Sequence, residues 1–376
     1  MLWYKYDMDT LKSPNGKNRI GIYLSAIFIL FICAVVSVMM ERTNFSFGNI
    51  STATPFGIKA DEKNKNMELA AVEPVVLSLD TALYDKKMIE LANYASTTST
   101  TTVRLWPTKT VYPNAGALLP FNRIVAYYGN LYSKGMGVLG QYPEDVMLQK
   151  LQAEVKKWEL ADPTTPVIPA LHYIDVTAQE SAGSDGKYRL RMPDSQIDEV
   201  LRMAKKIDAI VFIDVQVGKS TIQEELPLLD TYLKMPNVHF GIDPEFSMKT
   251  GKRPCTVIGT MDASDINYTA RYLAKIVRDN NLPPKILVIH RFTEDMVTNY
   301  ELIKPLPEVQ IVIDMDGWGD PAKKLNTYRQ VVYFEPVQFA GFKLFYKNDL
   351  LPPSTRILTP DDLLELKPRP IYIQFQ

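Results

Sequence analysis

Short apolar segments rich in β-branched residues recur along the second part of the chain. They lie at Arg123–Tyr128, Val167–His172, Ala209–Val215, Val238–Asp243, Lys285–His290, Gln310–Met315, Phe339–Phe345 and Ile371–Phe375. Between them, apolar residues recur at spacings of three and four, which is typical of amphipathic helices. We expect these helices at 143–160, 194–206, 219–234, 262–281, 293–303, 320–335 and 360–367. Strands that alternate with helices in this way predict parallel β-α-β units.

The number and order of these segments indicate the fold class. Eight strands within the 255 residues from 122 to 376 match the usual size of a (β/α)8 barrel of the TIM type. The competing fold is an open, doubly wound sheet, which normally carries a G-x-G-x-x-G turn after its first strand. The segment Gly129-Asn130-Leu131-Tyr132-Ser133 lacks that pattern. We therefore expect an α/β protein whose residues 122–376 form a (β/α)8 barrel.

An uncharged apolar segment near the N-terminus predicts a transmembrane helix. Residues 21–40 contain no charged side chain, and a helix of this length spans about 30 Å, the thickness of the hydrocarbon core. A cleaved signal peptide has a shorter apolar core, followed by a small-residue cleavage site, which is missing after residue 40. A lipoprotein signal needs a small residue before its cysteine, but Ile32 precedes Cys33. We expect residues 21–40 to remain as an anchor.

The charges beside this segment predict its orientation. Four basic residues precede it and one follows closely: Lys5, Lys12, Lys17 and Arg19 before it, and Arg42 after it. The positive-inside rule then places residues 1–20 in the cytoplasm and the barrel on the other side of the membrane. We expect a single-pass protein of the cell membrane with a polar stalk at 41–74.

Residues 75–121 separate this stalk from the barrel, and we expect them to pack on the barrel. Val75–Leu79 has the composition of a strand, and residues 81–95 have the apolar spacing of a short helix. Ser96–Thr102 is a Ser/Thr-rich tract, a composition typical of loops.

Composition and charge exclude several classes of function. The chain is 46% hydrophobic and 23% charged, which is ordinary for a globular protein and argues against a disordered or fibrous one. Lys and Arg number 42 against 43 Asp and Glu, so the excess of basic charge that marks a nucleic-acid binder is missing and we expect no such partner. Two cysteines exclude a cysteine-rich zinc site, and three histidines would all be needed for a three-histidine centre.

Ionisable residues follow the apolar part of several predicted strands. Alternate strand residues face the barrel interior, and active sites of this fold lie at the C-terminal ends of the strands. A buried carboxylate needs a partner, so a cluster of them at one end indicates a pocket with a function. The expected inward-facing sets are Phe212, Asp214 and Gln216; Gly241, Asp243 and Glu245; Val288 and His290; Val312, Asp314 and Asp316; Gly341, Lys343 and Phe345; and His172.

Glycoside hydrolysis is the first chemistry that these residues indicate. It requires one carboxylic acid to protonate the leaving oxygen and one carboxylate to act as nucleophile or base. Glu245 is a candidate acid, because the neighbouring Asp243 would raise its pKa. Asp316 or Asp314, two strands away, would act from the opposite side of a bound sugar. The candidate catalytic residues are Glu245, Asp316, Asp243 and Asp314, and no cofactor is expected.

A bound envelope carbohydrate would need further contacts at the same end of the barrel. Aromatic residues near strand ends can stack on sugar faces, and polar side chains can bond to hydroxyl groups. The candidate substrate-binding residues are Tyr128, Asn130, His172, Asp214, Gln216, His290, Trp318, Lys343 and Tyr346.

Two alternatives remain open. Oxygen ligands with one imidazole suit Mg²⁺, Ca²⁺ or Mn²⁺, and such a site would favour a phosphodiesterase-like enzyme. Its candidate ligands are Asp214, Asp243, Glu245, His290 and Asp316. The second alternative is a non-catalytic barrel that binds an envelope polymer, in which the carboxylates only bond to sugar hydroxyls.

Two shorter motifs carry less weight. Gly218-Lys219-Ser220 resembles the end of a phosphate-binding loop, but Asp214 stands where the first glycine is required. We expect a simple strand-to-helix turn there. Cys255 follows the basic Lys252 and Arg253, a setting that would lower the pKa of its thiol.

Several strand-end segments together resemble a known group of proteins. These segments are Phe121-Asn122-Arg123-Ile124-Val125-Ala126-Tyr127-Tyr128-Gly129-Asn130, Gly241-Ile242-Asp243-Pro244-Glu245-Phe246, Asp314-Met315-Asp316-Gly317 and Gly341-Phe342-Lys343-Leu344-Phe345-Tyr346. Over about residues 120–376 the chain resembles uncharacterised bacterial envelope proteins that are often labelled hypothetical lipoproteins. This resemblance implies a glycosidase-like barrel exported across the membrane. The chain departs from glycosidases that carry Asn-Glu after strand four, because Asp243-Pro244-Glu245 stands there.

Overall fold

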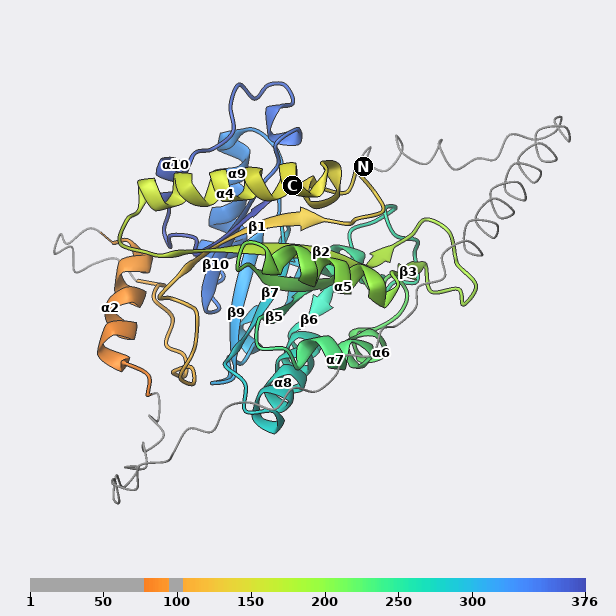
Figure 1. Cartoon of the computed structure of the whole chain (residues 1–376), viewed down its shortest axis with the longest axis horizontal. Helices are drawn as coiled ribbons and strands as arrows, with labels where there is room; N and C mark the ends of the chain where they lie inside the picture. The colour runs from red at the N-terminus through yellow and green to blue at the C-terminus, as the bar shows by residue number, and fades with distance from the viewer. Residues whose placement is uncertain (1–77, 95–103) are drawn as a thin grey trace, which may run out of the picture. The chain divides into compact units, whose positions relative to one another are not determined.

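Eight parallel strands close into a barrel in the computed structural model of this protein (Figure 1). The structure describes residues 78–94 and 104–376. The barrel strands, in their order around the ring, are β1 (Arg123–Gly129), β2 (Val167–Ala178), β4 (Ile210–Val215), β5 (Val238–Ile242), β7 (Lys285–Arg291), β9 (Val309–Met315), β10 (Phe339–Leu344) and β11 (Tyr372–Phe375). Parallel pairing of β1 with both β2 and β11 closes the ring. All eight predicted strands and the predicted barrel are confirmed.

Three shorter strands lie outside this ring. β3 (Arg189–Arg191) pairs antiparallel with the extended end of β2. β6 (Met261–Asp262) and β8 (Val297–Thr298) pair with each other.

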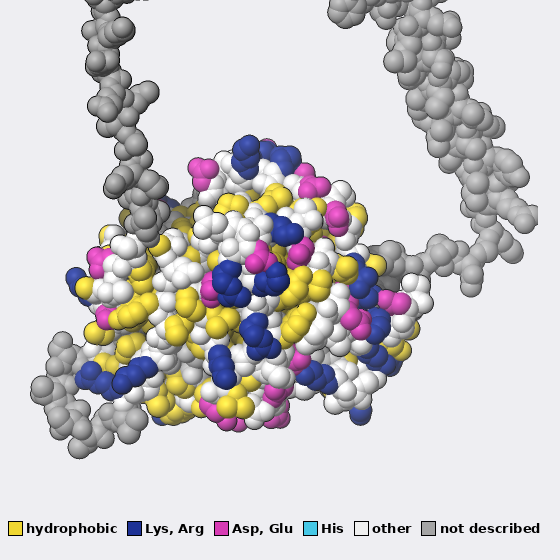
Figure 2. Space-filling view, turned by 90° about the horizontal axis from the view of Figure 1, so that it is seen from below, with side chains coloured by type: hydrophobic (Ala, Val, Ile, Leu, Met, Phe, Trp, Pro, Cys, Tyr) yellow, Lys and Arg dark blue, Asp and Glu magenta, His cyan; other side chains and the backbone are white. Residues whose placement is uncertain are grey.

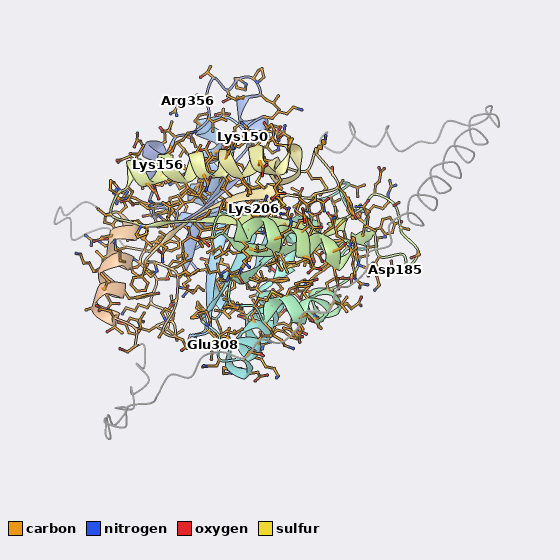
Figure 3. All side chains as sticks on the ribbon, viewed as in Figure 1. Lys150, Lys156, Asp185, Lys206, Glu308 and Arg356 are labelled. Atoms are coloured by element: carbon orange, nitrogen blue, oxygen red, sulfur yellow. The ribbon has the colours of Figure 1, made fainter. Side chains whose placement is uncertain are left out.

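Helices cover the outside of the barrel, as α4, α5 and α8 show in Figure 1. The α-helices are α2 (Thr81–Ala92), α3 (Val138–Gln141), α4 (Glu144–Ala161), α5 (Asp194–Lys205), α6 (Ile222–Glu225), α7 (Asp230–Leu233), α8 (Ala263–Asp279), α9 (Pro321–Tyr328) and α10 (Pro360–Leu364). Short 3₁₀ turns are η2 (Leu226–Leu229), η3 (Pro244–Phe246), η4 (Glu294–Met296), η5 (Tyr300–Leu302) and η7 (Asn348–Leu350), and η6 (Arg329–Tyr333) is a π-helical turn. Figure 3 shows Asp185 and Arg356 toward the edge of the molecule and Lys150 beside α4.

Residues at the N-termini show how several of these helices begin. Thr359 caps α10 and Asp262 caps α8, and each forms a capping box with the residue three positions later. Asp194 is the first residue of α5, and Pro193 occupies the cap position.

The predicted helix at 293–303 is wrong. This segment forms η4, β8 and η5 instead. The buried guanidinium group of Arg291 donates hydrogen bonds to the backbone carbonyls of Thr293, Glu294 and Val297. Carbonyls that accept hydrogen bonds from this side chain are not available for the backbone hydrogen bonds of a helix. The segment therefore wraps around Arg291.

The predicted helix at 219–234 is present only in pieces. It divides into α6, η2 and α7, with Pro227 near the start of the 3₁₀ turn. Proline has no N–H to donate, so it interrupts a helix in its interior.

Alternation along the strands separates two apolar layers. Val211, Ile213 and Val215 of β4 belong to the layer between strands and helices. Ile210 and Phe212 of the same strand belong to the barrel interior, together with Ile286 and Val288 of β7. The predicted inward-facing parity is therefore confirmed, and it points Asp214 and His290 into the barrel near its C-terminal end.

The N-terminal end of the barrel is closed by residues that precede β1. The Leu119 backbone exchanges two hydrogen bonds with the Gln310 side chain, at 3.1 and 2.5 Å. Tyr84 and Met88 of α2 belong to the same apolar cluster as the barrel interior. Ligands can therefore approach the interior only from the other end of the strands.

Several sequence predictions fall outside the described residues. These are the cytoplasmic segment 1–20, the anchor 21–40, the stalk 41–74 and the Ser/Thr tract Ser96–Thr102. Residues 78–80 at the end of the predicted strand Val75–Leu79 are not a strand. Within residues 78–94 and 104–376, no helix has the length and apolar character needed to cross a membrane.

Candidate active site

A cluster of ionisable side chains fills the C-terminal end of the barrel. Its deepest members are His172 of β2, Asp214 of β4, His290 of β7 and Asp314 of β9, all fully buried. Asp243 and Lys343 are 2% exposed, whereas the Asp316 side chain is 9% exposed and Glu245 is half-buried. Asp316 and Glu245 therefore form the part of the cluster nearest to solvent.

Asp214 connects the two histidines at the bottom of this cluster. Its Oδ1 lies 3.5 Å from His172 Nε2 and 3.7 Å from His290 Nε2, and its Oδ2 accepts a hydrogen bond from the Tyr128 hydroxyl at 3.0 Å. Burial alone would raise the pKa of Asp214, but His290 and His172 outweigh it and hold this pKa near 2. Asp214 is thus ionised at neutral pH.

His290 is surrounded by acids. Its Nδ1 lies 3.2 Å from Asp316 Oδ2 and 3.4 Å from Asp314 Oδ2. Burial would lower the pKa of His290, yet Asp214, Asp314 and Asp316 together raise it well above its ordinary value. Burial has the opposite outcome at His172, where it lowers the pKa to about 4. The His290 imidazole is therefore charged at neutral pH, whereas the His172 imidazole is neutral.

Asp316 is held between two cations. Lys343 Nζ lies 3.0 Å from Asp316 Oδ1, and the same ammonium group sits 3.8 Å from the centre of the Tyr128 ring. Burial would raise the pKa of Asp316, but Lys343 and His290 bring it below its ordinary value. Asp316 is therefore an ionised carboxylate at the mouth of the barrel.

Glu245 has the opposite character. No hydrogen bond or ion pair joins its carboxyl group to another residue in the described part of the chain. Burial and the nearby charges of Asp243 and Asp316 raise its pKa to about 8. Asp243 fixes this segment, because its Oδ1 accepts from the Glu245 backbone N–H at 3.2 Å and its Oδ2 accepts from Gln216 at 3.2 Å. Glu245 is thus protonated at neutral pH.

Glycines on two strands make room for the buried aspartates. A Cβ at Gly241 would lie 2.5 Å from Asp214 Oδ1 and 2.6 Å from His172 Nε2. A Cβ at Gly341 would lie 2.6 Å from Asp314 Oδ1. Neither strand could carry a larger inward side chain without displacing the cluster.

The structure brings most of the predicted site residues together, with two exceptions. Tyr346 bonds to the Tyr127 hydroxyl at 3.0 Å and stacks on Phe375, and both partners belong to the outer apolar layer. The Asn130 amide is used by the backbone, since it donates to Ile174 O and accepts from Tyr132 N. Tyr346 and Asn130 therefore have partners outside the cluster, because β10 has ended before Tyr346 and a local turn uses the Asn130 side chain. Their contacts with substrate stay predictions.

The remaining predictions have different outcomes. Trp318 is half-buried, and the Lys323 ammonium lies 4.6 Å from its ring centre, so its contact with substrate stays a prediction. Asp314 is fully buried, a position from which it supports His290. The expected low pKa of Cys255 is wrong, since burial and the nearby Glu245 raise it to about 11.

The predicted set of five metal ligands is not found as one group. Among the described residues, the donor atoms that gather within 4.8 Å of one another belong to His172, Asp214 and His290. Asp243, Glu245 and Asp316 lie outside this group.

Sequence analysis missed two residues of the cluster and a buried ion pair behind it. The Tyr372 hydroxyl lies 2.6 Å from His172 Nδ1, and Gln374 Nε2 lies 3.2 Å from the same atom. Both alternate with outward-facing residues of β11, so the parity of this last strand would have found them. Lys324 and Asp349 form an ion pair at 2.8 Å with almost no exposure, for which the sequence offers no signal.

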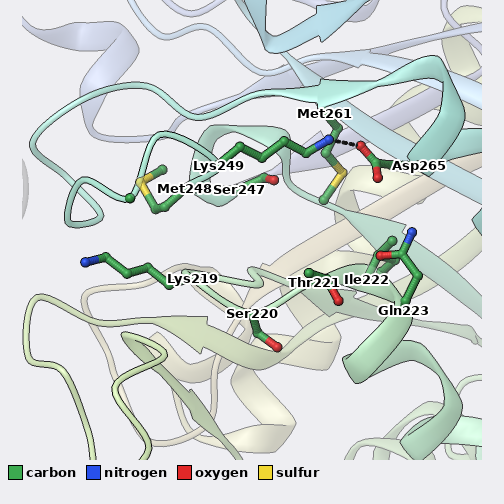
Figure 4. A pocket seen from close by; sticks show the side chains of 11 residues that line it. Lys219, Ser220, Thr221, Ile222, Gln223, Ser247, Met248, Lys249, Met261 and Asp265 are labelled. Atoms are coloured by element: carbon green, nitrogen blue, oxygen red, sulfur yellow. Dashed lines mark hydrogen bonds and ion pairs between the residues drawn. The ribbon is translucent and has the colours of Figure 1, made fainter.

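A pocket of about 370 Å³ lies between loops at the C-terminal ends of β4 and β5 (Figure 4). Loop residues after β4 and β5 line it, including Lys219, Thr221, Ser247 and Lys249. Lys249 is paired with Asp265 across one wall. Gly218 has a φ of +60° and forms the turn expected for the Gly218-Lys219-Ser220 segment.

No family model and no curated protein matches this chain. Among solved structures, it is similar to a tri-modular GH5 subfamily 4 endo-β-1,4-glucanase from Bacillus licheniformis, with 13% identity and a TM-score of 0.36 over 69% of this chain and 54% of that one. The chain thus spans about half the length of that endoglucanase. It is also similar to the Bacillus subtilis mannanase BCman, with 12% identity and a TM-score of 0.36 over 69% of this chain and 81% of that one. A third similar structure is the Bacillus subtilis mannanase man26, with 14% identity and a TM-score of 0.36 over 68% of this chain and 80% of that one. The barrel assignment rests on the strand pairing described above.

Proposed function

We propose that this protein is a glycoside hydrolase in which Glu245 acts as general acid and Asp316 as nucleophile or base. One observation carries the proposal. The two carboxyl groups nearest to solvent are in opposite environments, Asp316 between Lys343 and His290 and Glu245 without a polar partner among the described residues. Two carboxyl groups held in different protonation states are what hydrolysis of a glycosidic bond requires.

The positions of the two residues suit attack from two sides of a bound sugar. Glu245 follows β5 and Asp316 follows β9, with β7 between these strands in the ring. His290 of β7 contacts Asp316. In this arrangement, Glu245 donates its proton to the leaving oxygen while Asp316 stabilises or attacks the anomeric carbon.

The substrate that we propose is a carbohydrate of the cell envelope. Polar groups of the pocket between the loops after β4 and β5, such as Thr221, Gln223 and Ser247, would provide hydrogen-bond partners for sugar hydroxyls. The envelope location rests on the sequence, where the apolar segment 21–40 and its flanking charges predict a membrane anchor and an extracytoplasmic barrel.

Substrates with different leaving groups test the proposed roles. Replacement of a general acid harms the hydrolysis of poor leaving groups most, because activated aryl leaving groups depart without a proton. We expect Glu245→Gln to lose about 10³-fold in kcat on unactivated oligosaccharides and about 10-fold on dinitrophenyl glycosides. Asp316→Asn should lose activity on both.

A surface variant, Glu199→Gln, serves as the control because Glu199 lies on the exposed side of α5. Thermal melts establish that each variant folds. Equal activity of Glu245→Gln and the unmodified protein on unactivated oligosaccharides would refute the assigned acid.

A further inference from the structure

We propose that His172, Asp214 and His290 bind a divalent transition-metal ion, with Zn²⁺ as the best match. This inference concerns the bottom of the cluster and does not depend on the proposed hydrolysis. The three side chains come from β2, β4 and β7, and each is fully buried. The atoms concerned are His172 Nε2, Asp214 Oδ1 and His290 Nε2.

These three atoms converge without hydrogen-bonding one another. None of them has a hydrogen-bond partner within the described part of the chain, although buried polar atoms in proteins are nearly always paired. Their separations are 3.5 Å between His172 and Asp214 and 3.7 Å between His290 and Asp214. Ligands at about 2.1 Å from a tetrahedral Zn²⁺ lie about 3.4 Å apart. The two separations from Asp214 are close to this value, and all three donor atoms lie within 4.8 Å of one another.

The surroundings orient all three ligands. Tyr128 donates to the second oxygen of Asp214 at 3.0 Å, which leaves Oδ1 directed at the histidines. With its proton on Nδ1, His172 donates to the Tyr372 hydroxyl at 2.6 Å and presents the Nε2 lone pair. Support of a metal-binding histidine through its other ring nitrogen is the usual arrangement in metal sites.

His290 has the same kind of support from carboxylates. Its Nδ1 faces Asp314 and Asp316 at 3.4 and 3.2 Å, as in a carboxylate–histidine–metal chain. Binding of the ion at Nε2 would release the proton that this nitrogen carries in the charged imidazole, while Nδ1 keeps its proton. Gly241 contributes by its lack of a side chain, because a Cβ there would fill the space beside Asp214 Oδ1 and His172 Nε2. A glycine at this position keeps the space between the ligands open.

The donor atoms favour one class of ion. Two imidazole nitrogens and one carboxylate oxygen suit Zn²⁺ and its neighbours in the first transition series, whereas Mg²⁺ and Ca²⁺ prefer oxygen ligands. The buried acids also outnumber the cations. Among the described residues, Asp316 is the one of these three aspartates (Asp214, Asp314 and Asp316) that pairs with a lysine, Lys343. A divalent cation would offset part of the negative charge that remains.

The test uses the full chain, purified in detergent and treated with a chelator. Isothermal titration with Zn²⁺ should show one site, and Co²⁺ substitution should give the intense visible absorption of a tetrahedral centre. We expect His172→Gln and Asp214→Asn each to weaken Zn²⁺ binding by more than about 100-fold. Tyr372→Phe, which removes only an orienting group, should weaken it about 10-fold.

His239→Gln is the matched control. His239 is a buried histidine of β5, and its Nδ1 accepts from the Ile286 backbone N–H, away from the three ligands. Its replacement should leave the Zn²⁺ affinity unchanged. The proposal is overturned if the unmodified chain takes up no Zn²⁺, which would mean that His290 serves only as a buried cation. It is also overturned if folded His172→Gln and Asp214→Asn variants bind Zn²⁺ as tightly as the control.

Discussion

Individual carboxyl groups in this protein differ in pKa by several units because their neighbours differ. Asp214 is held near pKa 2 by two histidines despite its complete burial, whereas Glu245 reaches about 8 where burial and acids act together. Asp175 on β2 is a third case, since burial, Asp194 and Glu225 raise its pKa to about 7. The sign of each shift follows from whether a cation reaches the carboxylate.

Asp175 gives a prediction for the pH dependence of stability. Its pKa is about 7 in the folded protein against an ordinary 3.8, so the stability that it contributes is complete below pH 3.8 and is lost as pH rises through 7. We expect Asp175→Asn to raise the free energy of unfolding by about 1–3 kcal/mol at pH 8 and to have little effect near pH 3.5. Urea denaturation at the two pH values measures this difference.

The control for this experiment is Asp145→Asn, because the Asp145 side chain is 82% exposed. It should change stability by less than about 0.5 kcal/mol at either pH. A uniform effect of Asp175→Asn at both pH values would contradict the assigned titration.

The sequence predicted inward-facing residues well and loop residues poorly. Asp214, His290 and Lys343 lie on strands, where a strict period of two determines which face each residue occupies. Tyr346 lies beyond the end of β10, where that period stops, and it turned to the outer layer. The raised pKa of Glu245 was predicted from the neighbouring Asp243. Its burial, which is the largest cause, and the effect of Asp316, which is 71 positions away in the chain, could not be predicted from the sequence.

At the scale of elements, the loops after β9 and β10 are joined by a buried lysine. Lys324 of α9 donates to the carbonyls of Gly317 and Lys343 at 2.9 and 2.7 Å and pairs with Asp349 at 2.8 Å. Asp349 in turn accepts from the Gly319 backbone N–H at 3.0 Å. This network lies behind Asp316 and Lys343 and fixes the loops that carry them.

Removal of the lysine should therefore be costly. We expect Lys324→Met to lower the free energy of unfolding by about 3–5 kcal/mol, because it leaves a buried Asp349 without its cation. Lys275→Met is the matched control, since Lys275 pairs with Asp279 on the exposed side of α8. That pair should contribute less than about 1 kcal/mol. Chemical denaturation measures the free energy of unfolding of both variants. An equal loss in the two would contradict the prediction that the buried pair stabilises the protein more than the exposed pair.

Element boundaries were predictable where local signals agreed and not where a distant side chain intervened. The capping box at Thr359 is visible in the sequence and present in the structure. The apolar spacing over 293–303 indicates a helix, but the Arg291 guanidinium takes three of its carbonyls. A single buried side chain thus outweighed a weak periodic pattern.

At the scale of the whole molecule, the barrel follows from eight repeated strand–helix units. The closure of its N-terminal end could not be predicted from these units, because it joins Leu119 to Gln310, which are 191 positions apart in the sequence. The surface charge agrees with the nearly equal numbers of basic and acidic residues in the sequence. Figure 2 shows Lys and Arg side chains interspersed with acidic and hydrophobic ones on the face drawn.

The predicted membrane anchor has its own test. We expect the full chain to remain in the membrane fraction after alkaline extraction, and a chain that begins at residue 73 to be released. An alkaline phosphatase fused after residue 376 should be active, because that enzyme folds only outside the cytoplasm. An inactive fusion, or full release of the intact chain by alkali, would contradict the proposed anchor and orientation.

The protonation state of Glu245 tests the central claim most directly, because a general acid must carry its proton at working pH. Difference infrared spectroscopy can follow the protonated carboxyl groups of the full chain through a pH titration, and the band lost in Glu245→Gln identifies this residue. We predict a midpoint near pH 8, set by burial, Asp243 and Asp316. A midpoint near the ordinary 4.5 would contradict the account, because Glu245 would then be ionised at neutral pH and have no proton to give.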